Sequence, residues 1–336
     1  MTAERLRAAI DAYLTGTRAA SLGGAVDDLM TAYRSAEVPD RVLLGSDREV
    51  AAYAAYRMPA TYVAVRAALH QTATALPGWA PASVVDAGAG TGAASWAVAD
   101  AFPAATLTLL EQSEPAMRVG RALGLPRAEW RSWRMAGAVD LPPADLVVCA
   151  YVLGEVPEAT RAAFVAAVVD RAGAVLLVEP GTPPGYARVV AARRALVEAG
   201  WRLVAPCPHE AECPLAGTRD WCHFAARVER SALHRRLKDA RLGWEDEKYS
   251  FVAAVRAGSP DWPEARVLRH PQTRKGLVSL ELCVADGRAE RRLVGKREGG
   301  VYRAARKVSW GDRWEPSAAP VAGEEPQPLP RGDLEA

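Results

Sequence analysis

Three of the five cysteines in this 336-residue chain lie in one short stretch, 205-APCPHEAECPLAGTRDWCHF-224. Five residues separate Cys207 from Cys213 and eight separate Cys213 from Cys222, whereas a zinc-ribbon pair usually has about two to four. Cys207 and Cys213 are each followed by proline, which is also found beside iron–sulfur ligands. Thiolates at such spacing bind metal ions or clusters, and this set is one ligand short of a tetrahedral site.

Cys283 is the cysteine that could complete the set. It lies sixty-one residues after Cys222 in 277-LVSLELCVAD, which alternates as a strand does. Zinc is an alternative, with His209 or His223 as the fourth ligand, and free thiols are the remaining interpretation. Cysteines in a reducing compartment favour a metal or cluster over disulfides, but the spacing alone leaves iron–sulfur and zinc open.

A glycine-rich turn, 84-VVDAGAGTGAASW-96, follows a short apolar run and precedes an alanine-rich segment. Gly88, Gly90 and Gly92 allow the backbone to turn sharply and to approach a ligand at the N-terminus of the next helix. Nineteen residues after Gly92, Glu111 could accept hydrogen bonds from both ribose hydroxyls of an adenosine. The sequence therefore predicts a nucleoside site.

Two nucleoside cofactors fit this turn. Gly88, Gly90 and Ala93 match the G-x-G-x-x-A pattern of dinucleotide-binding proteins such as those that bind NAD. Asp86 and Gly92 complete a D-x-G-x-G-x-G turn that resembles that of class I S-adenosylmethionine enzymes, so we favour S-adenosylmethionine. A turn that only packs a helix on a sheet is the alternative without a ligand. The predicted cofactor-binding residues are Asp86, Gly88, Gly90, Gly92 and Glu111.

The segment 145-DLVVCAYVLGEV-156 stands where a methyltransferase of this class would hold its acceptor. It lacks the Asn/Asp-Pro-Pro-aromatic signature that holds an exocyclic amine, and the Pro-Cys nucleophile that attacks a pyrimidine carbon. Cys149 lies within the apolar strand and is expected to be a small buried thiol. Tyr151 and Glu155 are expected near the cofactor, but no pair of groups indicates acid–base catalysis. We predict no catalytic residue, and methyl transfer stays an open question.

The pattern of the chain divides it into four regions. Residues 1–80 show helical spacing of apolar residues, and Pro59 is expected to kink a helix or mark its first turn. Residues 81–200 alternate β-branched runs with alanine-rich helices, as in an open parallel α/β sheet. Residues 201–312 combine the cysteines with antiparallel hairpins, and residues 313–336 are predicted to be a disordered tail.

Charge is distributed unevenly, although the net charge is only +2. Residues 201–310 contain 22 Lys or Arg against 14 Asp or Glu, a net +8, which leaves −6 for the remainder. This excess predicts a polyanionic partner such as RNA, with an ordinary solvated surface as the alternative. No run reaches the roughly 18 to 20 apolar residues of a membrane span, so no membrane partner is expected. The predicted RNA contacts are Arg227, Arg230, Arg235, Arg236, Lys238, Arg266, Arg269, Arg274 and Lys275.

Several segments together resemble a known family. They include YAAYRMPATY from residue 53, LLEQSEPAMRVG from residue 109, LLVEPGTPPGYARV from residue 176, and the cysteine segments from residues 205 and 220. With the glycine turn, they are similar to the methyltransferase-like assembly factors of the small ribosomal subunit, whose mitochondrial members were first classed as ribosomal proteins. The resemblance covers roughly residues 40–310.

The resemblance implies an α/β fold with a class I methyltransferase sheet, S-adenosylmethionine as a ligand, and the rRNA of the immature small subunit as a partner. It also implies a 4Fe-4S cluster on Cys207, Cys213, Cys222 and Cys283, which favours iron–sulfur over zinc. We expect a monomeric assembly factor, cytoplasmic in a bacterium and mitochondrial in a eukaryote. Two alternatives stay open: an active S-adenosylmethionine-dependent rRNA methyltransferase, and an iron- or redox-sensing regulator of translation.

Overall fold

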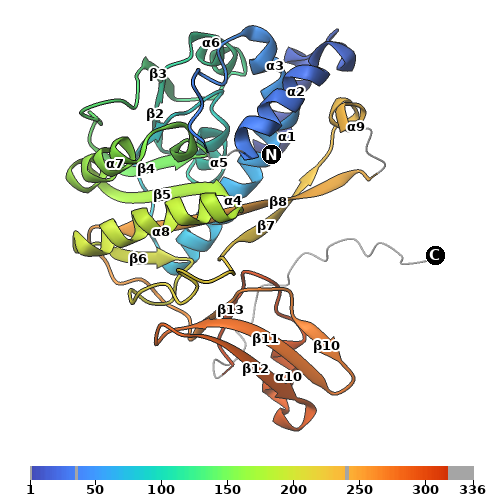
Figure 1. Cartoon of the computed structure of the whole chain (residues 1–336), viewed down its shortest axis with the longest axis vertical. Helices are drawn as coiled ribbons and strands as arrows, with labels where there is room; N and C mark the ends of the chain where they lie inside the picture. The colour runs from blue at the N-terminus through green and yellow to red at the C-terminus, as the bar shows by residue number, and fades with distance from the viewer. Residues whose placement is uncertain (1, 35–36, 239–241, 317–336) are drawn as a thin grey trace.

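The computed structural model describes residues 2–34, 37–238 and 242–316 (Figure 1). These residues form a large sheet among helices and a smaller sheet that lies beyond one side of it. From residue 317 onward, the predicted disordered tail lies outside the described residues. Within the described ranges, no helix is long and apolar enough to cross a membrane.

Among the described residues, the first sheet has eight strands in the order β3-β2-β1-β4-β5-β8-β6, with β7 paired to β8. The pairs among β1 to β5 are parallel, whereas β8 runs antiparallel to β5, β6 and β7. This order, with one antiparallel strand inserted before the last, is that of a class I methyltransferase sheet, and the predicted fold class is confirmed. The strands are β1 (Ser83–Ala87), β2 (Thr106–Glu111), β3 (Ala128–Ser132), β4 (Ala144–Ala150), β5 (Ala172–Pro180), β6 (Arg202–Ala205), β7 (Phe224–Glu229) and β8 (Trp244–Val255).

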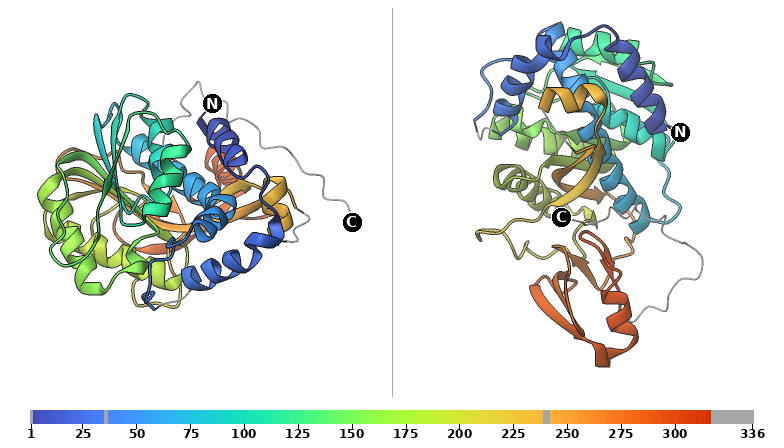
Figure 2. Two further views of the ribbon diagram at one scale, coloured as in Figure 1. Left: turned by 90° about the horizontal axis from the view of Figure 1, so that it is seen from above. Right: turned by 90° about the vertical axis from the view of Figure 1, so that its right-hand side faces the viewer.

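Helices cover both faces of this sheet (Figure 2). Because side chains alternate along a strand, Val84 and Leu146 pack against one helical layer, whereas Val85 and Val147 pack against the other. Central strands that are buried on both faces are apolar almost throughout. The first layer contains α1 (Thr2–Tyr13), α2 (Ala19–Arg34), α3 (Asp47–Tyr56), α4 (Met58–Ala75), α5 (Ala93–Ala101) and α6 (Glu114–Ala122), and the second contains α7 (Glu158–Arg171) and α8 (Pro183–Glu198).

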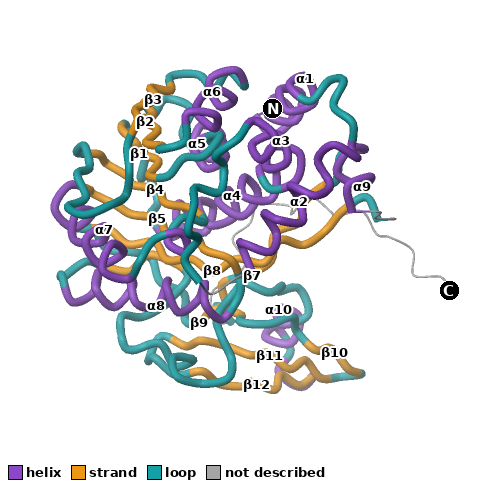
Figure 3. The backbone as a smooth tube through the Cα atoms, turned by 45° about the horizontal axis from the view of Figure 1, so that its top comes forward, coloured by secondary structure: helices purple, strands orange, loops and turns teal. Residues whose placement is uncertain are grey.

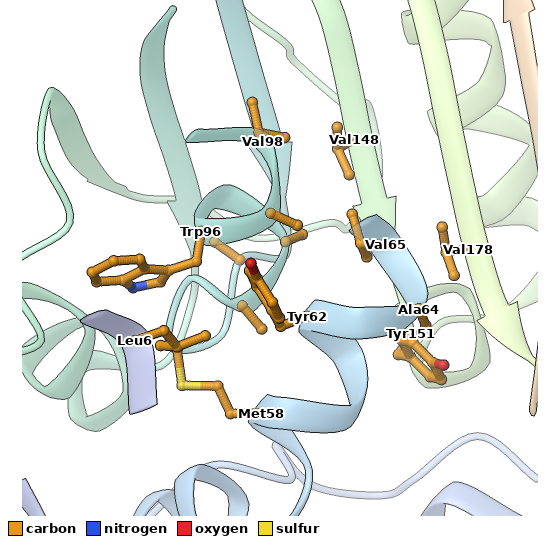
Figure 4. Packing of buried hydrophobic residues seen from close by; sticks show 14 of the residues in the cluster. Leu6, Met58, Tyr62, Ala64, Val65, Trp96, Val98, Val148, Tyr151 and Val178 are labelled. Carbon is orange, nitrogen blue, oxygen red and sulfur yellow. The ribbon is translucent and has the colours of Figure 1, made fainter. Parts of the chain in front are cut away.

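Helix α4 joins the N-terminal helices to the sheet. Pro59 stands in its first turn, where the missing amide hydrogen removes no helical hydrogen bond. Val65 of this helix lies beside Val148 and Val178 of β4 and β5 (Figure 4). The helical region expected from the sequence is thus a layer built onto the sheet rather than a separate core.

The first sheet continues to Val255, past the boundary at residue 200 that the sequence suggested. β6 and β8 form its far side, and the outer parts of β7 and β8 make a hairpin arm that carries α9 (Ala232–Lys238) (Figure 3). The first sheet extends this far because β8 is buried at every residue from Tyr249 onward, as expected of a strand inside a covered sheet. Residues 201–312, which the sequence analysis treats as one C-terminal region, therefore contribute strands to both sheets.

The second sheet is antiparallel, in the order β10-β11-β9-β13, with β12 along the other edge of β11. Val267, Leu280 and Val294 form its core together with Ala305 of the helix that packs on it. Trp314 is 2% exposed in β13, so the sheet extends beyond residue 312, where the tail was expected to begin. The elements are β9 (Ala265–Val267), β10 (Gln272–Arg274), β11 (Leu277–Val284), β12 (Ala289–Gly295), α10 (Gly300–Ala305) and β13 (Arg313–Trp314).

Two leucines of the second sheet provide a matched test of its core. Leu280 is fully buried, whereas Leu293 of β12 is 56% exposed. We expect Leu280→Ala to lower the free energy of unfolding by about 2–5 kcal/mol, because it leaves a cavity in the core. Leu293→Ala should change it by less than about 0.5 kcal/mol. Denaturant unfolding monitored by hydrogen exchange in β11 measures both, and equal losses would contradict the assigned core.

Candidate functional site

The glycine turn connects β1 to α5. Gly88, Gly90 and Gly92 have φ angles of 77°, 57° and 88°, all in the left-handed region that favours glycine. The Gly88 amide donates to the Leu110 carbonyl at 2.9 Å, which fixes the turn against the end of β2. A Cβ on Gly88 would approach Val152 to 2.5 Å, so the turn packs directly on the segment that follows β4.

Asp86 holds the start of α5 in place. Its Oδ2 accepts hydrogen bonds from the amide and the hydroxyl of Ser95, at 3.0 and 2.6 Å. Burial raises the pKa of Asp86 to about 6, although the hydrogen bonds from Ser95 oppose this rise. With 2% exposure, Asp86 lies behind the turn and positions it.

Glu111, at the end of β2, faces the turn. Its Oε2 accepts the Gly90 amide at 2.7 Å, and its Oε1 accepts the amides of Gln112 and Ser113 at 2.8 and 2.7 Å. Burial raises the pKa of Glu111, and the three amide donors oppose that rise. A carboxylate has about four lone-pair sites, so Glu111 keeps the capacity to accept a ligand hydroxyl.

A cavity of about 470 Å³ opens over the glycine turn. Its size falls within the roughly 300–1,000 Å³ of small-molecule sites. Gly88, Gly90 and Glu111 line the cavity, whereas Asp86 and Gly92 shape the turn behind it. The structure therefore brings three of the five predicted cofactor residues to one cavity and gives the other two a supporting role.

The N-terminal region supplies the opposite wall of this cavity, which sequence analysis missed. Tyr33 of α2, Tyr53 of α3 and residues 38–42 between these helices line it. Helical spacing in the sequence shows which face of a helix is apolar, but not which helix ends meet the ends of the strands. Only the placement of the first layer on the sheet reveals this wall.

A buried ion pair stands behind one wall of the cavity. Arg57 donates two hydrogen bonds to the Glu247 carboxylate of β8, at 2.9 and 2.7 Å. The Tyr151 hydroxyl donates to the same carboxylate at 2.9 Å, and the Arg57 guanidinium lies 5.5 Å from the Tyr151 ring centre. Tyr151 has a φ of 61°, which is unusual for a residue with a side chain. The network thus holds Tyr151 in a strained conformation directly after β4.

Glu155 lines the same cavity. Its carboxyl forms no hydrogen bond or ion pair with another described residue. Burial, together with the carboxyls of Glu111 and Glu179, raises the pKa of Glu155 to about 8. Glu179, by contrast, is paired with Arg188 at 2.6 Å. Glu155 is therefore a protonated acid at neutral pH that faces an open cavity.

The four cysteines predicted as metal ligands line one small cavity where the two sheets meet. Cys207, Cys213 and Cys222 come from the loop between β6 and β7, and Cys283 comes from β11. Cys149 lies elsewhere, fully buried in β4, as its apolar surroundings suggested. Residues sixty-one positions apart in the sequence are thus brought to one place by the contact between the sheets.

Polar groups lie beside two of these sulfur atoms. The Tyr186 hydroxyl of α8 is 3.1 Å from Cys213 Sγ. The His209 Nε2 is 3.3 Å from Cys283 Sγ. Both groups can donate a hydrogen bond to a thiolate, His209 in the tautomer that carries its proton on Nε2.

Two arginines also line the cysteine cavity. Arg193 of α8 donates to the carbonyls of His209 and Ala211 at 3.1 and 2.6 Å, but its buried Nε has no partner among the described residues. Burial raises the pKa of the Cys207 thiol, and the guanidiniums of Arg193 and Arg266 oppose that rise. The cavity therefore combines thiols with buried positive charge.

No group of three or more His, Cys, Asp or Glu side chains among the described residues is arranged so that it could hold a metal ion. The cysteine cavity measures about 30 Å³. Burial raises the pKa of Cys222 and Cys283, which favours the protonated thiols. The structure thus gathers the four thiols without forming a coordination site.

The basic residues between Arg227 and Lys238 lie partly in a strand and partly in a helix. Arg227 lies in β7, where its Nε donates to Asp246 at 3.0 Å and its guanidinium lies 3.7 Å from the Trp244 ring centre. Arg230 precedes α9 and pairs with Glu245 at 2.8 Å. The strand forms because 224-FAARVE-229 pairs residue by residue with β8, and this tertiary pairing overrides helical spacing.

The remaining basic residues of this segment lie on α9. Arg235 and Arg236 are exposed. The backbone of Lys238 belongs to α9, but its side chain lies outside the described part of the chain. Of the basic side chains predicted there to contact RNA, Arg235 and Arg236 are exposed, Arg227 is exposed but paired with Asp246, and Arg230 is paired with Glu245.

Arg266 and Arg269 form hydrogen bonds with the cysteine loop. Arg266 is 3% exposed and donates to the carbonyls of Pro206 and Gly311 at 2.9 and 3.1 Å. Arg269 donates to the Trp221 carbonyl at 2.9 Å. Both brace the cysteine loop, because β9 packs against it, and no local pattern of residues indicates that these charges are enclosed.

Arg274 and Lys275 are exposed at the end of β10, as an RNA contact requires. The Lys296 amide donates to the Gly276 carbonyl at 2.9 Å, which brings Lys296 and Arg297 beside them. Sequence analysis missed the second group, although a count of basic residues after β12 would have found it. We call the following set the basic end of the second sheet: Arg274, Lys275, Lys296, Arg297, Arg303, Arg306 and Lys307.

Comparison with known proteins finds a family that matches most of the chain. The family described as mitochondrial small ribosomal subunit Rsm22 matches residues 47–315. The human protein named ribosome assembly protein METTL17, mitochondrial, is 29% identical over 289 residues, which cover 77% of this chain and 61% of that protein. The Rsm22-cox11 tandem protein 2 of Schizosaccharomyces pombe is 27% identical over 189 residues, 43% of this chain and 25% of that protein. The chain thus spans less than two thirds of the length of these relatives.

Solved methyltransferase structures resemble the chain at low similarity. Magnesium protoporphyrin IX methyltransferase from Synechocystis PCC 6803, with bound SAH, has a TM-score of 0.39 and 16% identity, covering 69% of this chain and 93% of that one. The putative RNA methyltransferase PH1948 from Pyrococcus horikoshii has a TM-score of 0.39 and 14% identity, covering 68% and 96%. At these scores the likeness carries no statement about ligands or substrates.

The raised pKa of Glu155 predicts a pH-dependent stability. Its value of about 8 in the folded protein lies above the ordinary 4.5, so the folded state binds the proton more tightly than the unfolded state. The contribution of Glu155 to stability therefore falls as pH rises from about 4.5 to 8. Glu155→Gln should remove this fall, so its gain over the wild type grows from pH 5 to pH 8 in denaturant unfolding. A difference that is constant with pH would contradict the assignment.

Proposed function

Because the chain belongs to the family described as mitochondrial small ribosomal subunit Rsm22, we propose that it assists assembly of the small ribosomal subunit by binding immature rRNA. The family match over residues 47–315, which includes both sheets and the cysteine loop, carries this proposal. The relative named as a mitochondrial ribosome assembly protein aligns with 77% of this chain. We place the protein, as a monomer, where small subunits are made: the cytoplasm of a bacterium or the mitochondrion of a eukaryote.

The basic end of the second sheet is the proposed RNA surface. Its seven side chains are exposed, and in the described residues none of them makes an ion pair with a carboxylate. Phosphate binding needs lysine and arginine that are free to replace counterions along the backbone of the nucleic acid. Arg235 and Arg236 on the arm form a second, smaller contact of the same kind.

We infer that the cavity over the glycine turn binds S-adenosylmethionine. Gly88 and Gly90 let the backbone approach the ligand, and Glu111 has lone pairs left for a ribose hydroxyl. Asp86 and Gly92 hold the turn in shape. The ligand, when bound, supplies a sulfonium methyl group.

The residues after β4 support a binding role over methyl transfer. The Tyr151 hydroxyl is engaged by Glu247, and Arg57 occupies both oxygens of that carboxylate. One observation favours the second candidate, an rRNA methyltransferase: the pKa of Glu155, about 8, is near the value that suits a general acid or base at neutral pH. Without an acceptor-binding motif beside it, we take assembly as the function.

We propose further that Cys207, Cys213, Cys222 and Cys283 hold a 4Fe-4S cluster. Such a cluster is an anion when four thiolates hold it, and the buried Arg193 offers an unpaired Nε beside it. Zinc, at about 2.3 Å from each sulfur, is the alternative. Ligation of a cluster by these four cysteines would join the cysteine loop to β11 and so fix the second sheet against the first.

Two cysteine variants test the cluster. We expect anaerobically purified wild-type protein to be brown, with about four irons and four labile sulfides per chain. Cys283→Ser should lose most of the iron, because β11 then offers no thiolate. Cys149→Ala, which changes a buried cysteine outside the cavity, should retain the iron. Stoichiometric zinc in a colourless wild type, measured by metal analysis, would contradict the proposal.

Removing charge from the basic end should weaken RNA binding in a salt-dependent way. For the variant Arg274→Ala/Lys275→Ala/Lys296→Ala, we expect the slope of log affinity against log salt to fall by about 0.7–0.9 for each phosphate that the variant no longer binds. The measurement is binding to small-subunit rRNA at several salt concentrations. Arg131→Ala is the matched control, because this exposed arginine of β3 pairs with Glu129 far from the second sheet.

Adding radiolabelled S-adenosylmethionine to the mixture of protein and small-subunit rRNA distinguishes the assembly role from methyl transfer. Stoichiometric RNA binding without label in the RNA supports the assembly role. Label that enters the RNA with the wild type, and is lost when a residue of the cavity is changed, would establish a methyltransferase. An unchanged salt slope in the triple variant would contradict the proposed RNA surface.

A further inference from the structure

We propose that Glu155 is the anionic partner of a positive charge on the ligand in the first-sheet cavity, either the sulfonium or the α-ammonium of S-adenosylmethionine. The inference rests on the proposed ligand of that cavity. It adds a charge preference that the glycine turn and Glu111 do not supply, because their contacts are suited to the nucleoside part of the ligand.

The position of Glu155 suits this role. It ends the short 3₁₀ helix after β4, lines the cavity, and has no hydrogen-bonding partner among the described residues. Tyr33, Tyr53 and Tyr151 line the same cavity, from α2, α3 and the end of β4. Faces of aromatic rings attract cations, so a cation beside Glu155 would meet both a carboxylate and aromatic rings.

Two neighbouring carboxyls show how the fold normally treats buried acids. Glu111 accepts three backbone amides, and Glu179 pairs with Arg188 while it accepts the Leu153 amide. A buried carboxylate without such partners is costly, and the free protein avoids the cost by keeping Glu155 protonated. A cationic ligand would supply the missing partner and allow Glu155 to ionise.

Charges around Glu155 favour a cation over an anion at this end of the cavity. Glu111 and Glu179 are the carboxyls whose charges act on it, and they add to the effect of burial in raising its pKa. The titratable and charged groups that face Glu155 or share its cavity are Glu111, Glu179, Asp40, Cys149, Tyr33, Tyr53, Tyr151, Arg41 and Arg134.

Binding should therefore release a proton. Glu155 is mostly protonated at pH 7, because its pKa is about 8, and a bound cation favours the ionised form. Calorimetry at pH 7 in buffers of different ionisation enthalpy should show release of close to one proton per S-adenosylmethionine. Affinity should rise from pH 6 to 7.5, a range in which an α-ammonium with a pKa of about 7.7–8.0 largely keeps its charge. Glu155→Gln should show neither effect, and Asp86, which titrates near pH 6, is present in both proteins.

A series of three ligands identifies the charge that Glu155 recognises. S-adenosylmethionine carries a sulfonium and an ammonium, S-adenosylhomocysteine carries only the ammonium, and methylthioadenosine carries neither. Glu155→Gln should weaken S-adenosylmethionine binding by roughly 10- to 100-fold, as expected for loss of a hydrogen bond to a charged group, and leave methylthioadenosine unchanged. Weaker binding of S-adenosylmethionine alone assigns the sulfonium, and weaker binding of S-adenosylhomocysteine as well assigns the ammonium.

The control variant is Glu158→Gln, an exposed acid in the first turn of α7, which should change none of the three affinities. Unchanged S-adenosylmethionine affinity in Glu155→Gln, or an equal decrease for all three ligands, would overturn the assigned charge contact. Absence of binding by the wild type would instead refute the proposed ligand of the cavity. Glutamine keeps the shape of the side chain and needs no proton to be neutral, so we expect the variant to fold.

Discussion

The packing of the N-terminal helices on the first sheet depends on a buried ion pair. Arg57 and Glu247 have side chains that are 11% and 14% exposed, and they join the α3–α4 corner to β8. Removing one partner of such a pair typically costs about 3–5 kcal/mol, because the other charge is left without compensation. The Tyr151 hydroxyl also binds the Glu247 carboxylate. This network therefore connects the N-terminal helices, the hairpin arm and the wall of the cavity over the glycine turn.

Against this background, two side chains with unused hydrogen-bonding capacity lie beside the two proposed ligand sites. Glu155 lines the cavity over the glycine turn, and no described residue binds its carboxyl. Arg193 has an unpaired Nε beside the four thiols. Their charges are opposite, which fits a cationic ligand in the first cavity and an anionic cluster in the second. In both places the proposed ligand would supply a partner that the side chain lacks among the described residues.

The sequence predicts the parts of this structure that local physics determines. Gly88 and Gly90 could be identified because positive φ angles are readily adopted only by glycine, and the parallel strands because fully buried strands are apolar throughout. The burial of Arg266 could not be foreseen, because it depends on β9 packing against the cysteine loop. The position of Arg227 in a strand could not be foreseen either, because its pairing with β8 is not visible in the sequence.

Strand β8 takes part in both sites. Its Glu247 accepts the Tyr151 hydroxyl beside the cavity over the glycine turn. Its Ser250 hydroxyl donates to the Cys222 carbonyl at 2.8 Å beside the thiols. Glu247 pairs with Ala226 of β7, and Ser250 pairs with Glu179 of β5, so the two contacts stand three positions apart on one continuous strand. We therefore infer that β8 sets the spacing between the two proposed sites, because one strand carries a contact of each.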